Sequence, residues 1–405
     1  MSELPYLTSE LPGIGGRIKE RCEDFLVDEI PLYPPGGAGT HVYFRVTKRK
    51  LSTPAAVERI ARQMGVRPHE IGVAGLKDAH AVTTQMMSLE HADTDKLATC
   101  EDPQMKVEIV SRHTNKLRPG HLAGNRFTIR IRGAGAAQLA PARAILDVLT
   151  RRGVPNYFGP QRFGARDDTA LLGEALVKGD CELFIAIFLG LAREDDPGDC
   201  KAARDAFDAG FYARALDRWP RHYANERRAL AAYKKKQKAD RAMAAIDKRM
   251  KRLYVSAFQS AVFNEVAAGR IRSIDRVLVG DLAQKTDTGG IFAVEDAAAE
   301  QPRAESFQIS PTGPIPGYRS NLATGEPGKI ERDALVKFGV ELEDFRRVIA
   351  MKVKGTRRAL RFALIEPQLA AGNDEHGEYL ELAFAAASGC YATVALRELM
   401  KTGRQ

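Results

Sequence analysis

The stretch that decides the fold is "NRFTIRIRG" (125–133), in which apolar and polar residues alternate strictly. Phe127, Ile129 and Ile131 fall on one side of an extended chain, and the intervening threonine and arginines fall on the other. A period of two predicts a β-strand with one face in the core. Phe127 opens the apolar row, where an aromatic side chain could either fill the core or line the mouth of a cleft.

Outward from this strand, strand and helix signals alternate along the chain. Residues 52–65 predict a helix that starts at Thr53-Pro54 and stops at Gly65. Residues 165–250 are mostly helical in pattern, and "SPTGPIPG" (310–317) predicts a loop at a domain crossing. Further segments predict strands (23–30, 40–48, 71–75, 358–366, 378–386) and helices (140–153, 391–400). The pattern predicts a mixed α+β fold in which the two ends form one domain and the middle is inserted.

Length and composition are those of an ordinary globular protein. The 405 residues are 44% hydrophobic and 28% charged, enough for two or three domains. The longest apolar run, "LFIAIFLGLA" (183–192), has about half the ~20 residues of a membrane span, so we expect a buried helix. The first thirty residues lack the pattern of a signal peptide. The five cysteines contain no CxxC and the eight histidines no close metal spacing, so we expect a cytoplasmic protein without bound metal.

The positive charge is concentrated in one segment. Residues 214–252 hold 14 Lys or Arg against 4 Asp or Glu, a local charge of +10, whereas the whole chain carries +9. Such a segment either binds a polyanion or forms a solvated helix. Trp219, Tyr223 and Tyr233 are interleaved with the basic residues, and flat rings that stack on bases favour nucleic acid. The two interpretations stay open from this segment alone.

One carboxylate stands apart in "AGLKDAHAVTTQ" (74–85). Asp78 lies between a lysine and a histidine, directly after a short apolar segment bounded by glycines. It could be an Asx turn or a helix N-cap, or it could be held at a cleft for chemistry. His80 is then a hydrogen-bonding neighbour rather than a base.

Five segments, taken in order, resemble the TruD family of tRNA pseudouridine synthases from about residue 19 to residue 399. They are "AGLKDAHAVTTQ" (74–85), "GNRFTIRIRG" (124–133), "GVPNYFGPQRFG" (153–164), "RLYVSAFQSAVFN" (252–264) and "GCYATVALREL" (389–399). The resemblance implies a pseudouridine-synthase-type catalytic domain with a mostly antiparallel mixed sheet and flanking helices. A family-specific α/β insertion would interrupt it, giving a catalytic part at 1–155, the insertion at 156–306 and a second catalytic part at 307–405.

The resemblance also implies an activity and a site. Members isomerise uridine in tRNA, typically uridine-13, without metal or organic cofactor, and the target base is flipped out. The catalytic aspartate falls on Asp78, the stacking aromatic on Phe127 with Asn125 beside it, and an N-terminal lysine that reaches the site on Lys19. Such a protein would be a monomer whose partner is tRNA and which contacts no membrane.

An ionised carboxylate in a pocket needs a cation nearby, because burial alone favours the neutral acid. Lys19, Lys77 and Arg397 are the candidate partners, and Arg397 is the first choice for a direct ion pair. Lys77 would point to the opposite face of a strand and is expected to contact phosphate or to be exposed. For RNA binding the candidates are Arg162, Lys234, Lys235 and Lys236, although Arg162 could equally join parts of the protein together.

Two rival functions remain at this point. A noncatalytic RNA-binding protein would explain the basic segment but not the positions of Asp78 and Phe127. A small-molecule enzyme with an aspartate nucleophile would explain Asp78 and predicts no salt-dependent affinity for RNA.

Overall fold

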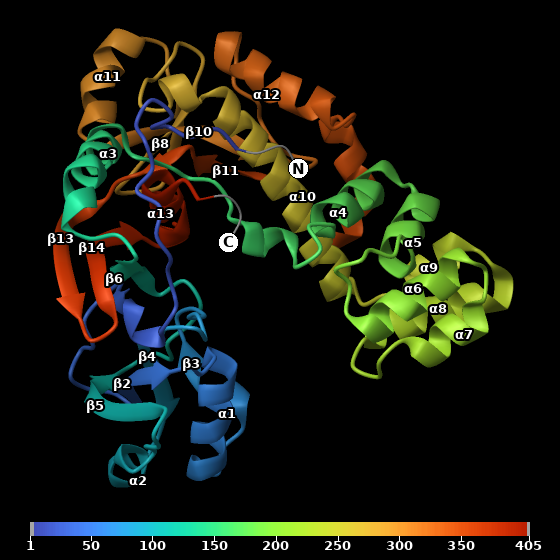
Figure 1. Cartoon of the computed structure of the whole chain (residues 1–405), viewed down its shortest axis with the longest axis horizontal. Helices are drawn as coiled ribbons and strands as arrows, with labels where there is room; N and C mark the ends of the chain where they lie inside the picture. The colour runs from blue at the N-terminus through green and yellow to red at the C-terminus, as the bar shows by residue number, and fades with distance from the viewer. Residues whose placement is uncertain (1–3, 403–405) are drawn as a thin grey trace. The chain divides into compact units, whose positions relative to one another are not determined.

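The computed structural model describes residues 4–402. The chain divides into two compact units. The sheet unit contains Tyr6–Val154 and the chain from Phe362 onward, and the helical unit contains Pro155–Arg361 with Pro5. The short strands β7 (Val154–Pro155) and β12 (Arg361–Phe362) are the places where the chain passes from one unit to the other. Figure 1 labels the elements of both units.

The sheet unit is built on one mixed sheet with the strand order β13-β14-β6-β1-β4-β2-β5, and β3 pairs with β4. The β1–β4 pair is parallel and the other neighbours are antiparallel. The predicted strand at 125–133 is therefore confirmed as part of a central strand. The strand bounds are β1 (Phe25–Pro31), β2 (His41–Arg49), β3 (Gly72–Val73), β4 (Val82–Glu90), β5 (Met105–His113), β6 (Leu122–Arg132), β13 (Ile365–Asp374) and β14 (Gly377–Ala387).

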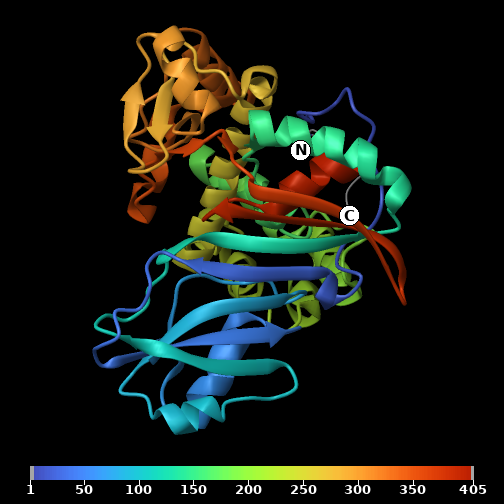
Figure 2. The same ribbon diagram turned by 90° about the vertical axis from the view of Figure 1, so that its left-hand side faces the viewer.

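Helices cover parts of this sheet. Helix α1 begins after Ser52, whose hydroxyl accepts from the Ala55 N–H, and ends at Gly65 with a φ of 74°. Its apolar face packs with residues of β2, β4 and β5 in one core cluster. Helices α3 and α13 lie together beside β13 and β14 (Figure 2). The bounds are α1 (Thr53–Met64), α2 (Thr94–Ala98), α3 (Leu139–Arg152) and α13 (Ala392–Met400), with 3₁₀ turns η1 (Cys22–Asp24), η2 (Pro68–Glu70) and η3 (Ala136–Gln138).

The helical unit combines packed helices with a smaller sheet of order β11-β10-β8-β9. Helix α10 is its longest element and packs on α4, α12 and β10. The strands are β8 (Leu282–Lys285), β9 (Ile291–Ala293), β10 (Ile309–Ile315) and β11 (Thr356–Ala359). The helices are η4 (Pro160–Phe163), α4 (Thr169–Lys178), α5 (Cys181–Leu189), α6 (Gly198–Asp208), α7 (Tyr212–Arg218), α8 (Ala224–Lys236), α9 (Ala239–Ala244), α10 (Lys248–Gly269), η5 (Ile271–Ser273), α11 (Ala297–Glu305), α12 (Gly325–Lys337) and η6 (Leu342–Met351).

The structure differs from the sequence-based expectation at 310–317. These residues form most of the buried strand β10 rather than a loop, although the strand contains Pro311 and Pro314. The first half of β10 pairs with β8 and the second half with β11. Each half therefore has one free edge, where a proline without an N–H is tolerated.

The division of the chain also differs from the expected one. The expected boundary at 155/156 lies one residue from the observed passage at Val154–Pro155. The expected boundary at 306/307 falls inside the helical unit, between α11 and β10. Residues 307–361 remain in that unit because β10 and α12 pack on α10, and η6 packs on α4.

Most of the apolar run at 183–192 lies in helix α5, which buries Phe184, Ile185 and Ile187–Leu189, whereas Leu183 and Leu191 are exposed. In the part of the chain that the structure describes, no helix is both long enough and apolar enough to cross a membrane.

Candidate active site

Asp78 lies in the loop between β3 and β4 (residues 74–81, the Asp78 loop). The backbone N–H of His80 donates to Asp78 Oδ1 over 2.8 Å, which makes the Asx turn that the sequence allowed. No helix follows, so the N-cap alternative is wrong. The Asp78 side chain is 29% exposed. One oxygen is thus fixed by the backbone, and the other is left for a side-chain partner.

That partner is Lys19, whose Nζ donates to Asp78 Oδ2. The two residues are 59 positions apart, and the Lys19 side chain is 20% exposed. The backbone of Lys19 has a φ of 58°, in the left-handed region that non-glycine residues rarely adopt. Such a conformation persists only where the surroundings enforce it, and it is commonly found at functional sites.

Two opposing effects set the pKa of Asp78. Burial raises it, whereas the hydrogen bonds from Lys19 and from the His80 N–H lower it. The net result is a pKa below the usual value, so Asp78 is a carboxylate at neutral pH. It can accept a proton or act as a nucleophile without a separate base to ionise it.

An aromatic cluster lies beside this ion pair. Lys19 Nζ is 4.6 Å from the centroid of the Phe25 ring, close enough for a cation–π contact. The Phe25 ring meets Phe127 edge-on at 6.5 Å, and Phe127 is 5.3 Å from Phe384 on β14. Phe127 is only 8% exposed, so it is mostly core. These contacts connect Asp78 to Phe127 through Lys19 and Phe25.

Asn125 shares the sheet face of Phe127, because the two are separated by one residue of β6. In the register of the sheet it lies opposite Glu29 on β1 and Ala386 on β14. Its buried Oδ1 accepts no hydrogen bond within residues 4–402. A buried acceptor without a donor costs free energy, and such a group in a native protein calls for an explanation such as a ligand.

Sequence reasoning missed Lys48, which holds the Asp78 loop from beneath. Its Nζ donates to the carbonyl of Leu51 over 2.6 Å and to the carbonyl of Asp78 over 3.4 Å. The residue is 1% exposed, and burial lowers the pKa of its amine to about 8, although Asp78 opposes this. The alternation of β2 could have found it, since Lys48 falls on the inward side with Val46.

Lys77 is also buried, so the expectation of an exposed side chain or phosphate contact is wrong. Its Nζ lies 2.8 Å from Glu29 Oε2, and the two side chains are 5% and 1% exposed. The Asp78 loop can bend so that Lys77 reaches β1, whereas a continuous strand would have directed it away.

Two further buried polar groups hold the loop at its start. The Lys77 N–H donates to Thr53 Oγ1 over 3.0 Å, and this hydroxyl donates to Gln85 Oε1 over 2.8 Å. The Gln85 amide in turn donates to the Gly75 carbonyl over 3.2 Å. Thr53 belongs to α1 and Gln85 to β4, so two packed elements fix the loop's backbone.

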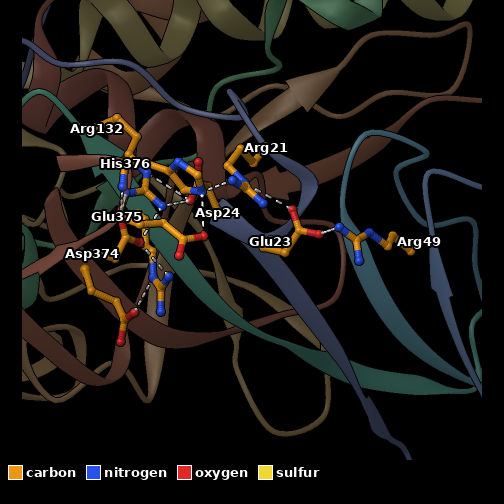
Figure 3. A network of polar contacts seen from close by, with 10 residues as sticks. Arg21, Glu23, Asp24, Arg49, Arg132, Asp374, Glu375 and His376 are labelled. Atoms are coloured by element: carbon orange, nitrogen blue, oxygen red, sulfur yellow. Dashed lines mark hydrogen bonds and ion pairs between the residues drawn. The ribbon is translucent and has the colours of Figure 1, made fainter. Parts of the chain in front are cut away.

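A second polar network anchors the segment that carries Lys19 (Figure 3). The buried Arg132 on β6 donates to Asp24 Oδ1 over 3.0 Å and to Asp374 Oδ1 over 2.6 Å. Its backbone also exchanges two 2.8 Å hydrogen bonds with Arg17. At the outer end of the network Arg21 contacts His376, and Glu23 pairs with Arg49. Residues 17–24 are thereby held on both sides of Lys19.

The first choice for the ion pair, Arg397, requires a correction. Arg397 lies on α13 as expected, with its guanidinium 3.9 Å from the centroid of the Tyr6 ring. The ion pair of Asp78 is with Lys19, from the opposite end of the sequence. The positions of Lys19, Lys77 and Arg397 in the sequence could not show which of these side chains reaches the Asp78 carboxylate.

The predicted RNA-binding residues fall into two kinds. Arg162 donates to the hydroxyls of Ser260 and Ser256 on α10, so it joins parts of the helical unit. The lysines of "KKK" (234–236) are exposed at the end of α8. Trp219 is 1% exposed and therefore core, in contrast to the stacking role that its basic neighbours suggested.

In the described part of the chain, no group of three or more His, Cys, Asp or Glu residues is placed so that it could hold a metal ion.

Comparisons with known proteins identify the family of the chain. The family model "tRNA pseudouridine synthase D (TruD)" matches residues 2–399. The chain belongs to the TruD family. It is 42% identical over 403 residues to the tRNA pseudouridine synthase D of Geobacter metallireducens, covering 99% of both chains. It is likewise 42% identical over 397 residues to the protein of that name from Geobacter sulfurreducens, covering 98% of this chain and 96% of the other.

Among solved structures, the TruD-family fold is matched by the crystal structure of a putative tRNA pseudouridine synthase D from Methanosarcina mazei. The TM-score is 0.87 at 29% identity, and the match covers 98% of this chain and 96% of that chain. The family resemblance and the fold class inferred from the sequence are thus confirmed.

Proposed function

We propose that this TruD-family chain isomerises uridine to pseudouridine in tRNA, at position 13, with Asp78 as the catalytic carboxylate. The observation that carries the proposal is the ionised Asp78, held by Lys19 and by the His80 N–H beside the Phe25–Phe127 pair. The family supports the substrate class, and position 13 rests on the family norm.

The chemistry needs few groups. The bond between N1 and C1′ breaks, the uracil turns, C5 bonds to C1′, and the proton lost from C5 is balanced by one gained at N1. No atoms or electrons enter or leave, so the reaction calls for no oxidant and no water. Asp78 would attack C1′ or take a proton from C2′, and both routes start from the carboxylate.

The detached base must stay in the site while it turns. Phe127 and Asn125, whose Oδ1 has no hydrogen-bond partner within residues 4–402, lie on one face of the sheet, where the ring would hold uracil by contact and the amide by a hydrogen bond to its N3–H. The uridine must first leave its stack, at a cost of about a few kcal/mol that contacts to the rest of the RNA would offset.

Incubation of the purified protein with bulk unmodified tRNA, followed by chemical mapping of pseudouridines, tests the proposal. We expect pseudouridine at position 13 of a subset of tRNAs. A tRNA pool that remains free of pseudouridine would contradict the activity, and a product at another position would contradict the site preference.

The exposed lysines 234–236 are proposed as phosphate contacts. Replacing all three by alanine should raise KM more than it lowers kcat, because they lie outside the chemistry. The salt dependence of tRNA affinity should also weaken by about 0.7 to 0.9 in slope for each lost phosphate contact. An unaltered KM and slope would favour a merely solvated helix end.

A further inference from the structure

The turn between α6 and α7 leaves one aromatic ring in solvent. Gly210 has a φ of 79°, and the Phe211 N–H donates to the Ala206 carbonyl over 2.8 Å, so the end of α6 is closed by backbone hydrogen bonds. In this kind of helix end, the residue after the left-handed glycine commonly packs back on the last turn. Phe211 is instead 62% exposed.

Phe211 does not stand alone on the surface. It lines a shallow groove of about 430 Å³ together with Gly210, Tyr212, Ala213, Arg214 and Lys234. Arg214 on α7 and Lys234 on α8 are both exposed. Within residues 4–402 neither of them forms a salt bridge. An exposed aromatic ring and two exposed cations in one groove are the composition of a site for single-stranded nucleic acid.

Three packed aromatic rings hold together the helices that carry the groove. The rings of Phe207, Tyr212 and Tyr233 lie 5.3 to 5.5 Å apart and join α6, α7 and α8. Tyr233, which the sequence suggested as a stacking residue, is therefore used for packing. Since these three rings already hold the helices together, Phe211 is not needed for the same purpose.

We infer that this groove binds an unpaired nucleotide of the RNA substrate, with its base stacked on Phe211 and its flanking phosphates on Arg214 and Lys234. The inference rests on the proposed function, which supplies the RNA. RNA fits better than a protein partner because Arg214 and Lys234, which line the groove, belong to the segment 214–252 with its local charge of +10.

The test is the dissociation constant for an unmodified tRNA transcript and for a short oligouridylate, measured by filter binding. Phe211→Ala and Phe211→Leu should weaken binding about five- to a hundredfold, the usual loss when one stacking ring is removed. Phe211→Tyr should bind as the wild type does. Arg214→Gln combined with Lys234→Gln should reduce the slope of log affinity against log salt by about 1.4 to 1.8.

Matched controls lie on α12 in the same unit. Val336 is 74% exposed, so Val336→Ala removes an exposed apolar group, and Lys329→Gln removes a lysine whose side chain is 75% exposed and pairs with Asp333 over 3.4 Å. Both should keep the wild-type affinity. Circular dichroism would show whether Phe211→Ala is folded. Unchanged affinity of folded Phe211→Ala for both RNAs would overturn the inference and assign the groove to another kind of partner.

Phe211→Trp gives a direct reading of stacking. The natural Trp219 is buried at 1% exposure, so wild-type emission supplies the baseline. Emission from the Phe211→Trp protein should fall on addition of oligouridylate, and no change would overturn stacking.

Pseudouridine formation by wild type and by Phe211→Ala is measured in parallel with RNA binding. If wild type forms pseudouridine but Phe211→Ala binds normally, only the groove is wrong; if wild type forms none yet binding depends on Phe211, only the proposed function is wrong.

Discussion

Two aspartates of the sheet unit have almost the same local geometry. Asp78 accepts from the N–H of His80 and pairs with Lys19, and Asp102 accepts from the N–H of Gln104 and pairs with Arg59. Their side chains are 29% and 31% exposed. In both, burial raises the pKa of the carboxyl, but the hydrogen bonds lower it by more, so the net pKa is below the usual value.

The difference lies in what surrounds each turn. The Asp78 loop is supported by the buried amines of Lys48 and Lys77. Lys19, the cation paired with Asp78, contacts the Phe25 ring. Arg59 bonds Asp102 and then the Gln104 side chain at the same turn. An Asx turn with an ion pair is therefore an ordinary structure. What distinguishes the Asp78 turn is that buried lysines support it and that an aromatic ring lies next to its ion pair. These features make the turn suitable for catalysis.

The largest effect should come from breaking the buried ion pair beneath the loop. Glu29→Leu leaves the Lys77 amine buried without its carboxylate and should lower the free energy of unfolding by about 3–5 kcal/mol. The double variant Glu29→Leu/Lys77→Met removes both charges and should recover most of this loss. Urea unfolding measures both, and a double variant no more stable than the single one would contradict the interpretation.

A comparable loss should follow truncation of Phe127, which the sequence left open between filling the core and lining a cleft. At 8% exposure the change should cost about 3–5 kcal/mol of stability. Phe127→Leu keeps an apolar side chain but removes the flat ring. It should remain folded and lose about 1–3 kcal/mol in kcat/KM through base stacking. Wild-type kcat/KM in folded Phe127→Leu would leave Phe127 as core alone.

Removing the cation should come next in size. Lys19→Met removes the hydrogen bond that most lowers the pKa of Asp78. Burial still raises this pKa, so it should be higher in the variant. The single-turnover rate should fall about 100-fold through loss of positioning. Its acid limb should also move to higher pH, because Asp78 takes up a proton sooner as pH falls. The control Arg59→Met, at the equivalent position beside Asp102, should leave the rate and its pH profile unchanged.

The smallest effect in this series is a pH dependence caused by Lys48. The unfolded chain keeps a proton on this amine up to about its usual pKa of 10.5, whereas the folded protein loses it near 8. Unfolding therefore takes up a proton in that window, and the free energy of unfolding should rise with pH between about 8 and 10.5. Lys48→Met should abolish this rise in urea unfolding. If the free energy of unfolding depended on pH in the same way in wild type and in Lys48→Met, the lowered pKa of the buried Lys48 amine would be contradicted.

Sequence predicted much of the sheet unit, and one of its failures has a clear physical cause. Strand β4 was missed because Thr83 and Gln85 are buried on it, and buried polar residues interrupt the apolar alternation that reveals a strand. Gln85 is one of the groups that hold the Asp78 loop. Local rules fail most readily at functional sites, where a polar group is placed in the core for a purpose.

Other failures concern reach and exposure. The family motif identified Lys19 and Asp78, but spacing could not show that Lys19 rather than Arg397 makes the ion pair. The basic segment was identified by charge alone. Its aromatic Trp219 is core, and the exposed ring, Phe211, lies just outside the segment.

The comparison of the two aspartates provides the most direct test of the account. Asp78→Asn and Asp102→Asn each remove one charge from an Asx turn and keep the side-chain shape. Single-turnover pseudouridine formation should be abolished in Asp78→Asn, with tRNA affinity within a few fold of wild type, and should be retained in Asp102→Asn. Product formed at the wild-type rate by Asp78→Asn would contradict the central claim.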